Sequence, residues 1–479
     1  LVGTTFAWFT DTASTGVNKI QAGNLDIELQ YATAWDNTTG APTGWDKAEG
    51  KTLTFKTKDN RAADKILWEP GCTYELPELR IVNKGNLALK YKISISGAKD
   101  ATPENDKNDL KLLDVIDWTY NVSGDGGATV AKLGTERHLA AKTGEADVFD
   151  TLTIKGQMQT SAGNDYQGMA IEGIAITVVA TQDTVENDSF GNEYDKDAEY
   201  PISVTTGDEL QAIVSNATAP VNIVLTNSIT TNNFVIPEDK DVTLDLNGFT
   251  LTGGDSHAIL NRGTLCIKDS SGNGKIVASK ANTSALRNGD NAVCVIEGGT
   301  FTRTNAADNK WHTVENFGTM TFNGGKVIAE DGQSFAIVNG WNYINPGEQK
   351  ATMTINNIEM KAGPNGFKNC AGGTLTMNGG TLHCTGFWGL SNDSTGVATI
   401  NGGKITSDGY VAISNGGAKM EINGGTFTGP KGSLYVQNYA QDTVVKGGSY
   451  QHETVEFMQN YCPTGYKATL ENGMVVVRG

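Results

Sequence analysis

The sequence predicts an all-β protein in two parts, an antiparallel β-sandwich followed by a parallel β-helix. Apolar and polar residues alternate with a period of two through much of residues 20–182. From residue 246 onward, a glycine-centred motif recurs at intervals of mostly 22 to 26 residues. Glycine is abundant (58 of 479 residues) and proline is scarce (11), which favours short strands joined by tight turns.

The alternation in the first half is typical of strands with one buried face. Leu25, Ile27 and Leu29 alternate with polar residues, and segments 87–95 and 174–178 follow the same pattern. Turn-forming clusters such as WEPG at 68–71 and NKGN at 83–86 separate these segments. The pattern predicts antiparallel sheets that pack face to face.

The second half contains repeats of a short motif that reads INGGK or MNGGT in its clearest copies. Its first glycine, or the residue that replaces it, is at positions 248, 274, 298, 324, 357, 379, 402, 424 and 447. The long step to 357 predicts an insertion near 340–350. One repeat of this length is expected to form one coil of a solenoid.

Alignment on that glycine gives two apolar columns and one polar column. Two residues before it stand Leu246, Ile296, Phe322, Ile355, Met377, Ile400, Ile422 and Val445. Three residues after it stand Leu251, Val277, Phe301, Val327, Met360, Leu382, Ile405, Phe427 and Tyr450. The position between holds mainly Thr, Lys, Ser and Glu, so it should face outward. Residues 204–479 therefore resemble a right-handed parallel β-helix of the pectate-lyase-like type.

An asparagine precedes the glycine in most copies: Asn247, Asn323, Asn378, Asn401 and Asn423. Asparagine tolerates the left-handed backbone conformation of a turn, and stacked amides can hydrogen-bond one another along the coil axis. We interpret these residues as a structural turn ladder rather than as ligand-binding groups.

The repeats give no pattern of catalytic residues. Three residues before the glycine, the column reads Asp245, Ser271, Val295, Thr321, Thr354, Thr376, Thr399, Glu421 and Val444, and its two acids are seven coils apart. Glycosidases need two carboxylates close together. We therefore expect no catalytic residues and no enzymatic activity, although the insertion near 340–350 could shelter a site.

Four aromatic residues at expected outward positions are candidates for binding sugars: Trp311, Trp341, Tyr343 and Trp388. They could form a stacking platform for a polysaccharide or host glycan, or they could cover the flanks of the helix under loops. Both interpretations stay open.

Composition excludes several classes of function. The net charge of −17 argues against nucleic acid, which needs a basic face. No apolar run is long enough to span a membrane. The five histidines are scattered and no HExxH motif is present, so we expect neither a metal nor a cofactor. The six cysteines are irregularly spaced and are expected to be buried thiols, with a Cys370–Cys384 bridge as an alternative.

Three segments of the first half resemble the TasA/camelysin family of secreted proteins from Gram-positive bacteria. They are FAWFTDTASTGVNKIQAGNLDIEL, WEPGCTYELPELRIVNKGNLALKYKISISG and GIAITVVATQDTVEND, in that order. The resemblance implies a jelly-roll sandwich over residues 20–182, export by a dedicated signal peptidase, and biofilm-matrix or cell-surface filaments. It also implies polymerisation by donation of an N-terminal strand. The shorter members of the family lack a β-helix.

Residues 1–19 form an N-terminal extension whose first nine residues carry no charge. Val2, Thr4, Phe6 and Trp8 would share one face of an extended strand, with Phe9 following them, so we expect a donor strand for a neighbouring subunit. Alternatively, this strand folds back onto its own sheet, or it is the remainder of a signal sequence with cleavage near Ala7. Residues 183–203 are read as an acidic linker to the β-helix.

Together these observations predict a secreted structural subunit of an extracellular surface or biofilm-matrix filament. The chain would polymerise with itself, and the β-helix would serve as a displayed spacer or binding arm. The alternative is a secreted carbohydrate-active enzyme, or a glycan-binding adhesin, that uses the outer face of the β-helix.

Overall fold

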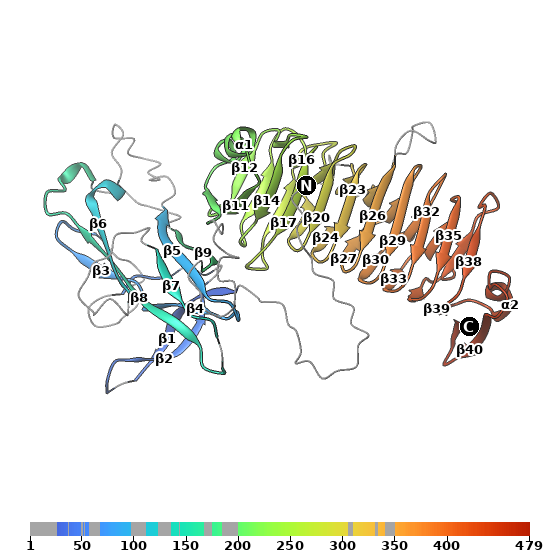
Figure 1. Ribbon diagram of the computed structural model, residues 1–479, viewed down its shortest axis with the longest axis horizontal. Helices are drawn as coiled ribbons and strands as arrows, with labels where there is room; N and C mark the ends of the chain where they lie inside the picture. Colours follow the sequence, from blue (N-terminus) through green and yellow to red (C-terminus); the bar gives the residue numbers. More distant parts are fainter. Residues whose placement is uncertain are drawn as a thin grey trace, which may run out of the picture.

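The computed structural model confirms an all-β chain with a parallel β-solenoid in its second half (Figure 1). It describes residues 26–36, 38–48, 51, 53–56, 68–96, 112–122, 136–142, 144–166, 175–183, 200–304, 310–330, 334–340 and 350–479. The predicted donor strand (Val2, Thr4, Phe6, Trp8 and Phe9) lies outside the described residues, as do Trp341 and Tyr343 and most of the acidic linker.

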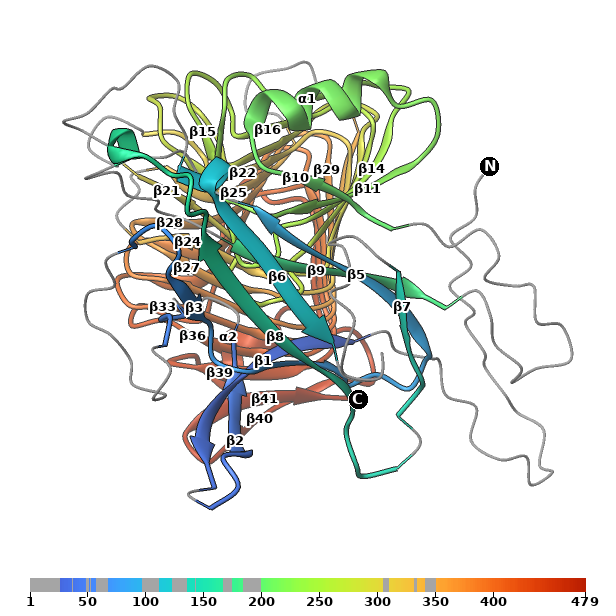
Figure 2. The ribbon, with the colours of Figure 1, turned by 90° about the vertical axis from the view of Figure 1, so that its left-hand side faces the viewer.

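The described residues of the N-terminal part form two antiparallel sheets, seen in front in Figure 2. The first has the strand order β2-β1-β4-β8-β3, with β6 also paired to β8. Its strands are β1 Ile27–Trp35, β2 Pro42–Lys47, β3 Thr73–Glu75, β4 Leu79–Asn83, β6 Ile116–Val122 and β8 Val148–Met158. The second has the order β7-β5-β9, with β5 Leu89–Ser96, β7 Arg137–Leu139 and β9 Ala175–Gln182. Two short 3-10 helices, Leu112–Val115 and Asn164–Tyr166, complete this part.

One apolar core lies between these two sheets. Leu79 and Ile81 of β4 and Leu152 of β8 pack in the same cluster as Leu89 and Tyr91 of β5, and all five are fully buried. The period-two pattern therefore predicted the antiparallel sheets correctly. Burial of this apolar area is the main stabilising term for the N-terminal part.

The solenoid is built from three parallel sheets, called D, E and F. Each complete coil contributes one strand to each sheet. Its first strand begins at Ile202, two residues before the predicted boundary of 204. Sheet D contains β10 Ile202–Val204, β11 Val221–Leu225, β14 Asp241–Asp245, β17 Thr264–Lys268, β20 Val293–Ile296, β23 Thr319–Phe322, β26 Ala351–Ile355, β29 Gly373–Met377, β32 Val397–Ile400, β35 Lys419–Ile422 and β38 Thr443–Val445.

Sheets E and F follow in each coil. Sheet E contains β12 Ile229–Thr231, β15 Thr250–Gly253, β18 Lys275–Ala278, β21 Thr300–Arg303, β24 Lys326–Ala329, β27 Glu359–Ala362, β30 Thr381–Cys384, β33 Lys404–Ser407, β36 Thr426–Thr428 and β39 Gly448–Gln451. Sheet F contains β13 Val235–Ile236, β16 Ile259–Asn261, β19 Leu286–Asn288, β22 Val314–Asn316, β25 Phe335–Asn339, β28 Asn365–Asn369, β31 Trp388–Asn392, β34 Val411–Asn415 and β37 Leu434–Val436.

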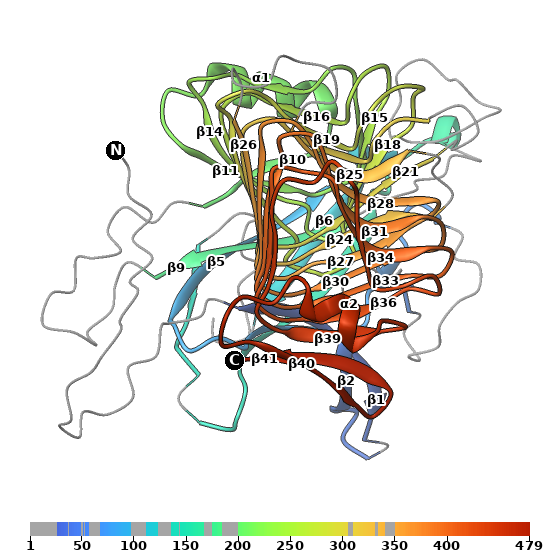
Figure 3. The same cartoon turned by 90° about the vertical axis from the view of Figure 1, so that its right-hand side faces the viewer.

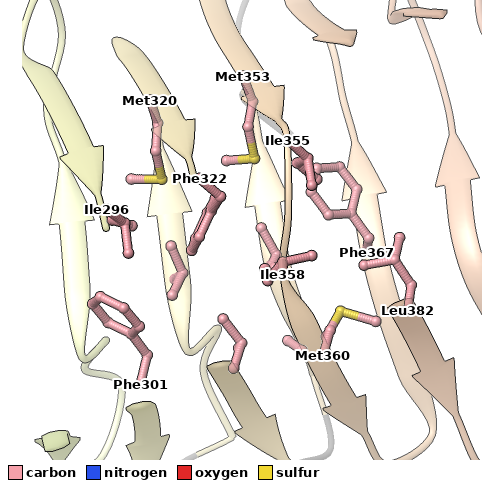
Figure 4. Packing of buried hydrophobic residues seen from close by; sticks show 14 of the residues in the cluster. Ile296, Phe301, Met320, Phe322, Met353, Ile355, Ile358, Met360, Phe367 and Leu382 are labelled. Atoms are coloured by element: carbon pink, nitrogen blue, oxygen red, sulfur yellow. The ribbon is translucent and has the colours of Figure 1, made fainter. Parts of the chain in front are cut away.

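Equivalent apolar residues of successive coils stack inside the solenoid (Figure 4). Residues Ile296, Phe322, Ile355, Met377, Ile400, Ile422 and Val445 form one buried column in register, as predicted. The predicted outward column also holds, since Thr300, Lys326, Glu359, Thr381 and Lys404 pair in succession on sheet E.

The alignment was wrong in the first coils. Leu244 and Ile267, not Leu246, pair into the column of Ile296, and Ile276, not Val277, pairs with Phe301. The turn between Ile267 and Lys275 is longer than the later Asn-Gly-Gly turns, so Gly274 occupies the place of the second glycine. The coils therefore keep the register of the buried apolar column even where the length of the turn changes.

The predicted turn ladder joins four of its five asparagines along the exposed corner between sheets D and E. Each Nδ2 donates to the side-chain oxygen of the preceding coil at 2.8–2.9 Å, in the order Glu297, Asn323, Asn356, Asn378, Asn401 and Asn423. Asn356 was not among the predicted residues. Asn247 is outside the ladder, because it adopts a positive φ of 46° and donates to the Leu225 carbonyl. In the later turns the second glycine takes the positive φ instead, as at Gly325 and Gly403.

A second ladder, which the sequence reasoning missed, is buried at the corner between sheets F and D. It consists of Asn261, Asn288, Asn316, Asn339, Asn369, Asn392 and Asn415, all with no exposed area. The Nδ2 of each of the first six donates to the Oδ1 of the next asparagine at 2.7–2.8 Å, and Asn415 donates to the Thr443 hydroxyl at 2.8 Å. Each also donates to a backbone carbonyl of the next coil, as Asn369 does to Val397 at 3.0 Å. The ladder thereby satisfies polar groups of a turn that water cannot reach.

Both ends of the solenoid are covered. At the first coil, helix α1 (Gly207–Asn216) buries Leu210 and Val214 in the solenoid core, with Thr206 as its N-cap. At the last coil, helix α2 (Val455–Gln459) packs beside the hairpin of β40 Lys467–Glu471 and β41 Met474–Arg478, which extends sheet E antiparallel to β39 (Figure 3). Gln459 Oε1 accepts a hydrogen bond from the Ala468 N–H, so α2 occupies part of the edge of β40.

All six cysteines are free thiols, which excludes the Cys370–Cys384 bridge. Both residues are buried, and Cys384 Sγ donates to the Gly363 carbonyl. Within the described part of the chain, no helix has the length and apolarity needed to cross a membrane.

The two asparagine ladders should differ sharply in their contribution to stability. Asn369→Ala removes a donor from the Asn392 oxygen and the Val397 carbonyl in a dry environment, and should cost about 3 kcal/mol of unfolding free energy. Asn401→Ala breaks equivalent hydrogen bonds between side-chain amides, but these are in contact with water. It should cost less than about 1 kcal/mol of unfolding free energy. Urea denaturation of both variants measures the difference, and equal costs would contradict the role given to the buried ladder.

Candidate functional site

A strip of aromatic side chains follows the corner between sheets E and F. It consists of Trp311, His312, Phe335, Phe387, Trp388, Tyr410 and Tyr435, and is called the aromatic strip below. Two of its residues stand immediately before a strand of sheet F: Phe387 precedes β31, and Tyr410 precedes β34. Stacking of the coils therefore aligns these side chains along the solenoid.

The rings of the strip touch one another over several coils. Trp311 and His312 have ring centroids 5.4 Å apart, and His312 lies 6.5 Å from Phe335. Phe335 and Trp388 stack almost parallel at 6.5 Å, although their strands are separated by β28. Farther along, Tyr410 meets Tyr435 edge-on at 6.4 Å. Aromatic pairs of this geometry hold one another in place.

The strip is half-buried at one end and exposed at the other. Trp311, His312 and Phe335 are half-buried, whereas Phe387 is 53% and Tyr435 is 46% exposed. Tyr439, which is also exposed, lies near Tyr435. The exposed rings are therefore available to a ligand, and the half-buried rings support them.

Charged groups accompany the middle of the strip. The Lys368 ammonium lies 5.3 Å from the centre of the Phe335 ring and 3.5 Å from an Asp393 carboxylate oxygen. A surface with exposed aromatic rings beside polar groups is suited to sugars, which present apolar C–H faces and hydroxyl edges.

Arg303 fixes the loop that carries Trp311. It lies at an inward-facing position of β21, in register with small residues of the neighbouring coils, and is almost fully buried. Its guanidinium donates to the Thr313 hydroxyl and to the Trp311 carbonyl. A buried guanidinium needs such partners, so the arginine and the loop stabilise each other.

Beneath the end of the aromatic strip that holds Trp311 and His312 lies a polar cluster around Glu315, which is only 2% exposed. The Ser284 hydroxyl donates to Glu315 Oε2 at 2.5 Å, and Arg287 Nη1 lies 3.4 Å from the same oxygen. Burial raises the pKa of the Glu315 carboxyl, while Arg287 and Ser284 oppose that effect. The Arg287 guanidinium also lies 4.7 Å from the centre of the Phe317 ring.

Two histidines border this cluster and are held neutral. His257 Nδ1 accepts a hydrogen bond from the Ser284 N–H at 2.9 Å, and His312 Nδ1 lies 2.8 Å from the Ser334 hydroxyl. Burial lowers the pKa of both imidazoles to about 4, with a further contribution from the Arg287 charge at His257. The neutral forms fit these contacts, because a neutral imidazole has one nitrogen free to accept.

This arrangement favours support over catalysis. The Glu315 carboxylate accepts hydrogen bonds from Ser284 and Arg287. It is too deeply buried to reach a polymer on the surface. Among the described residues, no three histidine, cysteine or acidic side chains gather closely enough to hold a metal ion.

The structure brings together two of the four predicted sugar-stacking residues, Trp311 and Trp388, which are connected through His312 and Phe335. The sequence reasoning missed the exposed rings of the strip. A signal was present for the exposed Phe387 and the half-buried Tyr410, since each stands eight residues after the first glycine of its turn, at 379 and 402. Tyr435 follows no comparable motif.

Comparison with known proteins found no matching family model, no matching curated protein and no matching solved structure. The likeness of the N-terminal half to the TasA/camelysin family therefore rests on its sequence motifs alone.

The two neutral histidines should make stability depend on pH. Unfolded histidines take up protons below about pH 6.5, whereas His257 and His312 resist protonation until about pH 4. The free energy of unfolding should therefore fall between pH 6.5 and 4, by about 1–2 kcal/mol for each histidine after allowance for partial exposure. Urea denaturation followed by tryptophan fluorescence measures this fall.

The double variant His257→Gln/His312→Gln isolates the effect from the other titrating groups. The difference in stability between the natural chain and this variant should shrink as the pH falls from 6.5 to 4. A difference that stays constant over that interval would contradict the assignment.

Proposed function

We propose that this chain is a secreted structural subunit of an extracellular surface or biofilm-matrix filament. The N-terminal part, with the jelly-roll topology expected from the TasA/camelysin resemblance, assembles the filament. The solenoid projects from it as a stiff arm. Residues 1–9 donate a strand to the neighbouring subunit.

The observation that carries this proposal is the edge strand β9. Among the described residues, β9 pairs with β5 over eight residues and has no partner strand on its other side. An unpaired edge can accept one more strand through its backbone N–H and carbonyl groups. The uncharged nine-residue segment LVGTTFAWF has a matching length and high β propensity.

The side chains of β9 favour the same pairing. Ile176 and Val178 pack against the core between the two sheets, with Ala180 on the same face. A strand added beside β9 would extend that face, and the alternate residues Val2, Thr4, Phe6 and Trp8 would supply apolar groups to it. Burial of a phenylalanine and a tryptophan would contribute several kcal/mol, which suits a durable filament.

The solenoid supports the role of a displayed arm. Its coils are joined by parallel backbone pairing on three sheets, by the buried asparagine ladder and by one continuous apolar core. Such an arm keeps its length and presents its surface at a fixed distance from the filament.

Glycan binding is a second candidate function, and the exposed rings of the aromatic strip favour it. The exposed Phe387 and Tyr435 lie with the half-buried Tyr410 on successive coils, so one polysaccharide chain could contact several of these rings. The buried Glu315 makes binding without hydrolysis the better expectation than the carbohydrate-active enzyme.

Loss of the N-terminal segment should abolish assembly. A chain lacking residues 1–9 should form no filaments and keep an intact solenoid, and addition of the free peptide LVGTTFAWF should cap growing filaments of the full chain. Phe6→Asp should also prevent assembly, because it places a charge on the face that enters the core. Thr5→Asp, on the opposite face, serves as the matched control.

Negative-stain electron microscopy and sedimentation velocity measure the outcome. Filaments of unchanged diameter from the truncated chain would end the donor-strand proposal.

The glycan proposal is tested on the exposed rings. Phe387→Ala and Tyr435→Ala should each weaken retention on insoluble polysaccharides by about tenfold, because each removes one stacking surface. Leu470→Ala, on the hairpin at the C-terminal end, is 68% exposed and should have no effect. Incubation with pectin, alginate, xylan and host glycans should release no reducing or unsaturated ends. Equal retention of all variants would remove the strip from consideration.

A further inference from the structure

The outer face of sheet D carries two columns of uncharged residues. One outward column runs through Thr264, Val293, Thr319, Thr352, Thr374 and Val397 on β17 to β32. Two positions further along each strand, the outward column holds only Thr, Val or Cys from Thr243 on β14 to Thr399 on β32. These two columns are called the Thr/Val face below.

The Thr/Val face is open and uncharged. Its four threonines in the first column are exposed, and Val293 is 38% exposed. The chain carries a net charge of −17, yet no ionisable group other than the Cys266 thiol falls within these two columns. Figure 1 shows the strands of sheet D lying side by side along the solenoid. A long, flat face of β-branched residues without charge lacks the usual protection against contact with another sheet.

We propose that the Thr/Val face binds a second copy of this chain, with the two solenoids antiparallel. The proposal does not depend on the donor strand or on the aromatic strip. Threonine and valine side chains of two such faces can interdigitate as in a β-sandwich, with hydroxyl groups paired across the contact.

Charge at the ends of the first column selects the orientation. Asp241 continues the column on β14, and Lys419 continues it on β35, where its ammonium lies 3.4 Å from Glu421, which continues the second column. A two-fold axis parallel to the strands, midway between β23 and β26, places Asp241 of one copy opposite Lys419 of the other, at both ends of the contact. The same operation places Thr319 opposite Thr352. Parallel solenoids would instead bring Asp241 and Asp245 of both copies together at the β14 end, away from Lys419.

The size of the face sets the strength of the contact. Seven strand steps separate Asp241 from Lys419, so the face is about 34 Å long and roughly 13 Å wide. The contact would then bury on the order of 450 Å² per copy, against about 800 Å² for a standard stable interface. Pairing should therefore be weak between free chains and strong where many copies are held together.

A zero-length carbodiimide cross-link, identified by mass spectrometry on the full chain, tests the orientation directly. A Lys419–Asp241 cross-link can form only between copies, because the two residues are about 34 Å apart within one chain. Thr352→Arg should remove this cross-link and weaken self-association by at least tenfold in a sedimentation concentration series. Thr381→Arg, at an exposed position of sheet E, is the matched control and should change neither.

Charge reversal provides an independent check. Asp241→Lys and Lys419→Asp should each weaken self-association about three- to tenfold, because each creates two like-charged contacts in the dimer. The double reversal should restore it. Asp241→Lys should keep the thermal melting point of the natural chain, whereas Lys419→Asp also loses the ion pair with Glu421 and should lower it slightly.

Three outcomes would overturn the proposal. One is a chain that stays free of Lys419–Asp241 cross-links up to millimolar concentration. Another is a double reversal that stays as weak as the single ones. The last is a Thr352→Arg variant that loses retention on chitin or cellulose but not self-association, which would assign the face to a polysaccharide.

Discussion

The buried asparagine ladder is the interaction on which the solenoid depends most. The corner between sheets F and D turns the chain inside a dry core, where backbone carbonyls have no water to bind. Each asparagine supplies donors to a carbonyl and to the next amide, so the ladder is complete only when the coils are stacked in register. A buried amide without hydrogen-bond partners costs more free energy than an exposed one. A coil that slips out of register therefore leaves costly unpaired amides along the ladder.

The sequence predicted the parts of the solenoid that repeat strictly. The Asn-Gly-Gly turns gave the correct register from Ile296 to Val445, because the chain between the two apolar columns has a nearly constant length there. They failed at Leu246 and Val277, where the turn is longer and the core, not the turn, decides the register. The buried ladder was not predicted because the number of residues between successive asparagines is not constant. The interval from Asn316 to Asn339 differs from that between Asn339 and Asn369, since the loops between them differ in length.

The candidate site was predictable only in part, for a related reason. Trp311 and Trp388 stood out by residue type, but their contact passes through His312 and Phe335, which come from different coils. A single sequence gives no measure of which loop residues will fold toward the same corner. Arg303 was less predictable still, because a charged residue at an inward-facing position contradicts the pattern of its own column. It is tolerated there because the loop carbonyl of Trp311 and the hydroxyl of Thr313 satisfy its guanidinium.

The caps at the two ends determine how the solenoid responds to mechanical load. Each inner coil is held only by its two neighbours, whereas α2 and the β40–β41 hairpin close the last coil. Tension applied at the C-terminus would first detach this cap and then strip coils one after another, each releasing a similar length of chain. Such stepwise unfolding dissipates energy over a long extension, so the solenoid would lose its coils gradually under load instead of unfolding all at once.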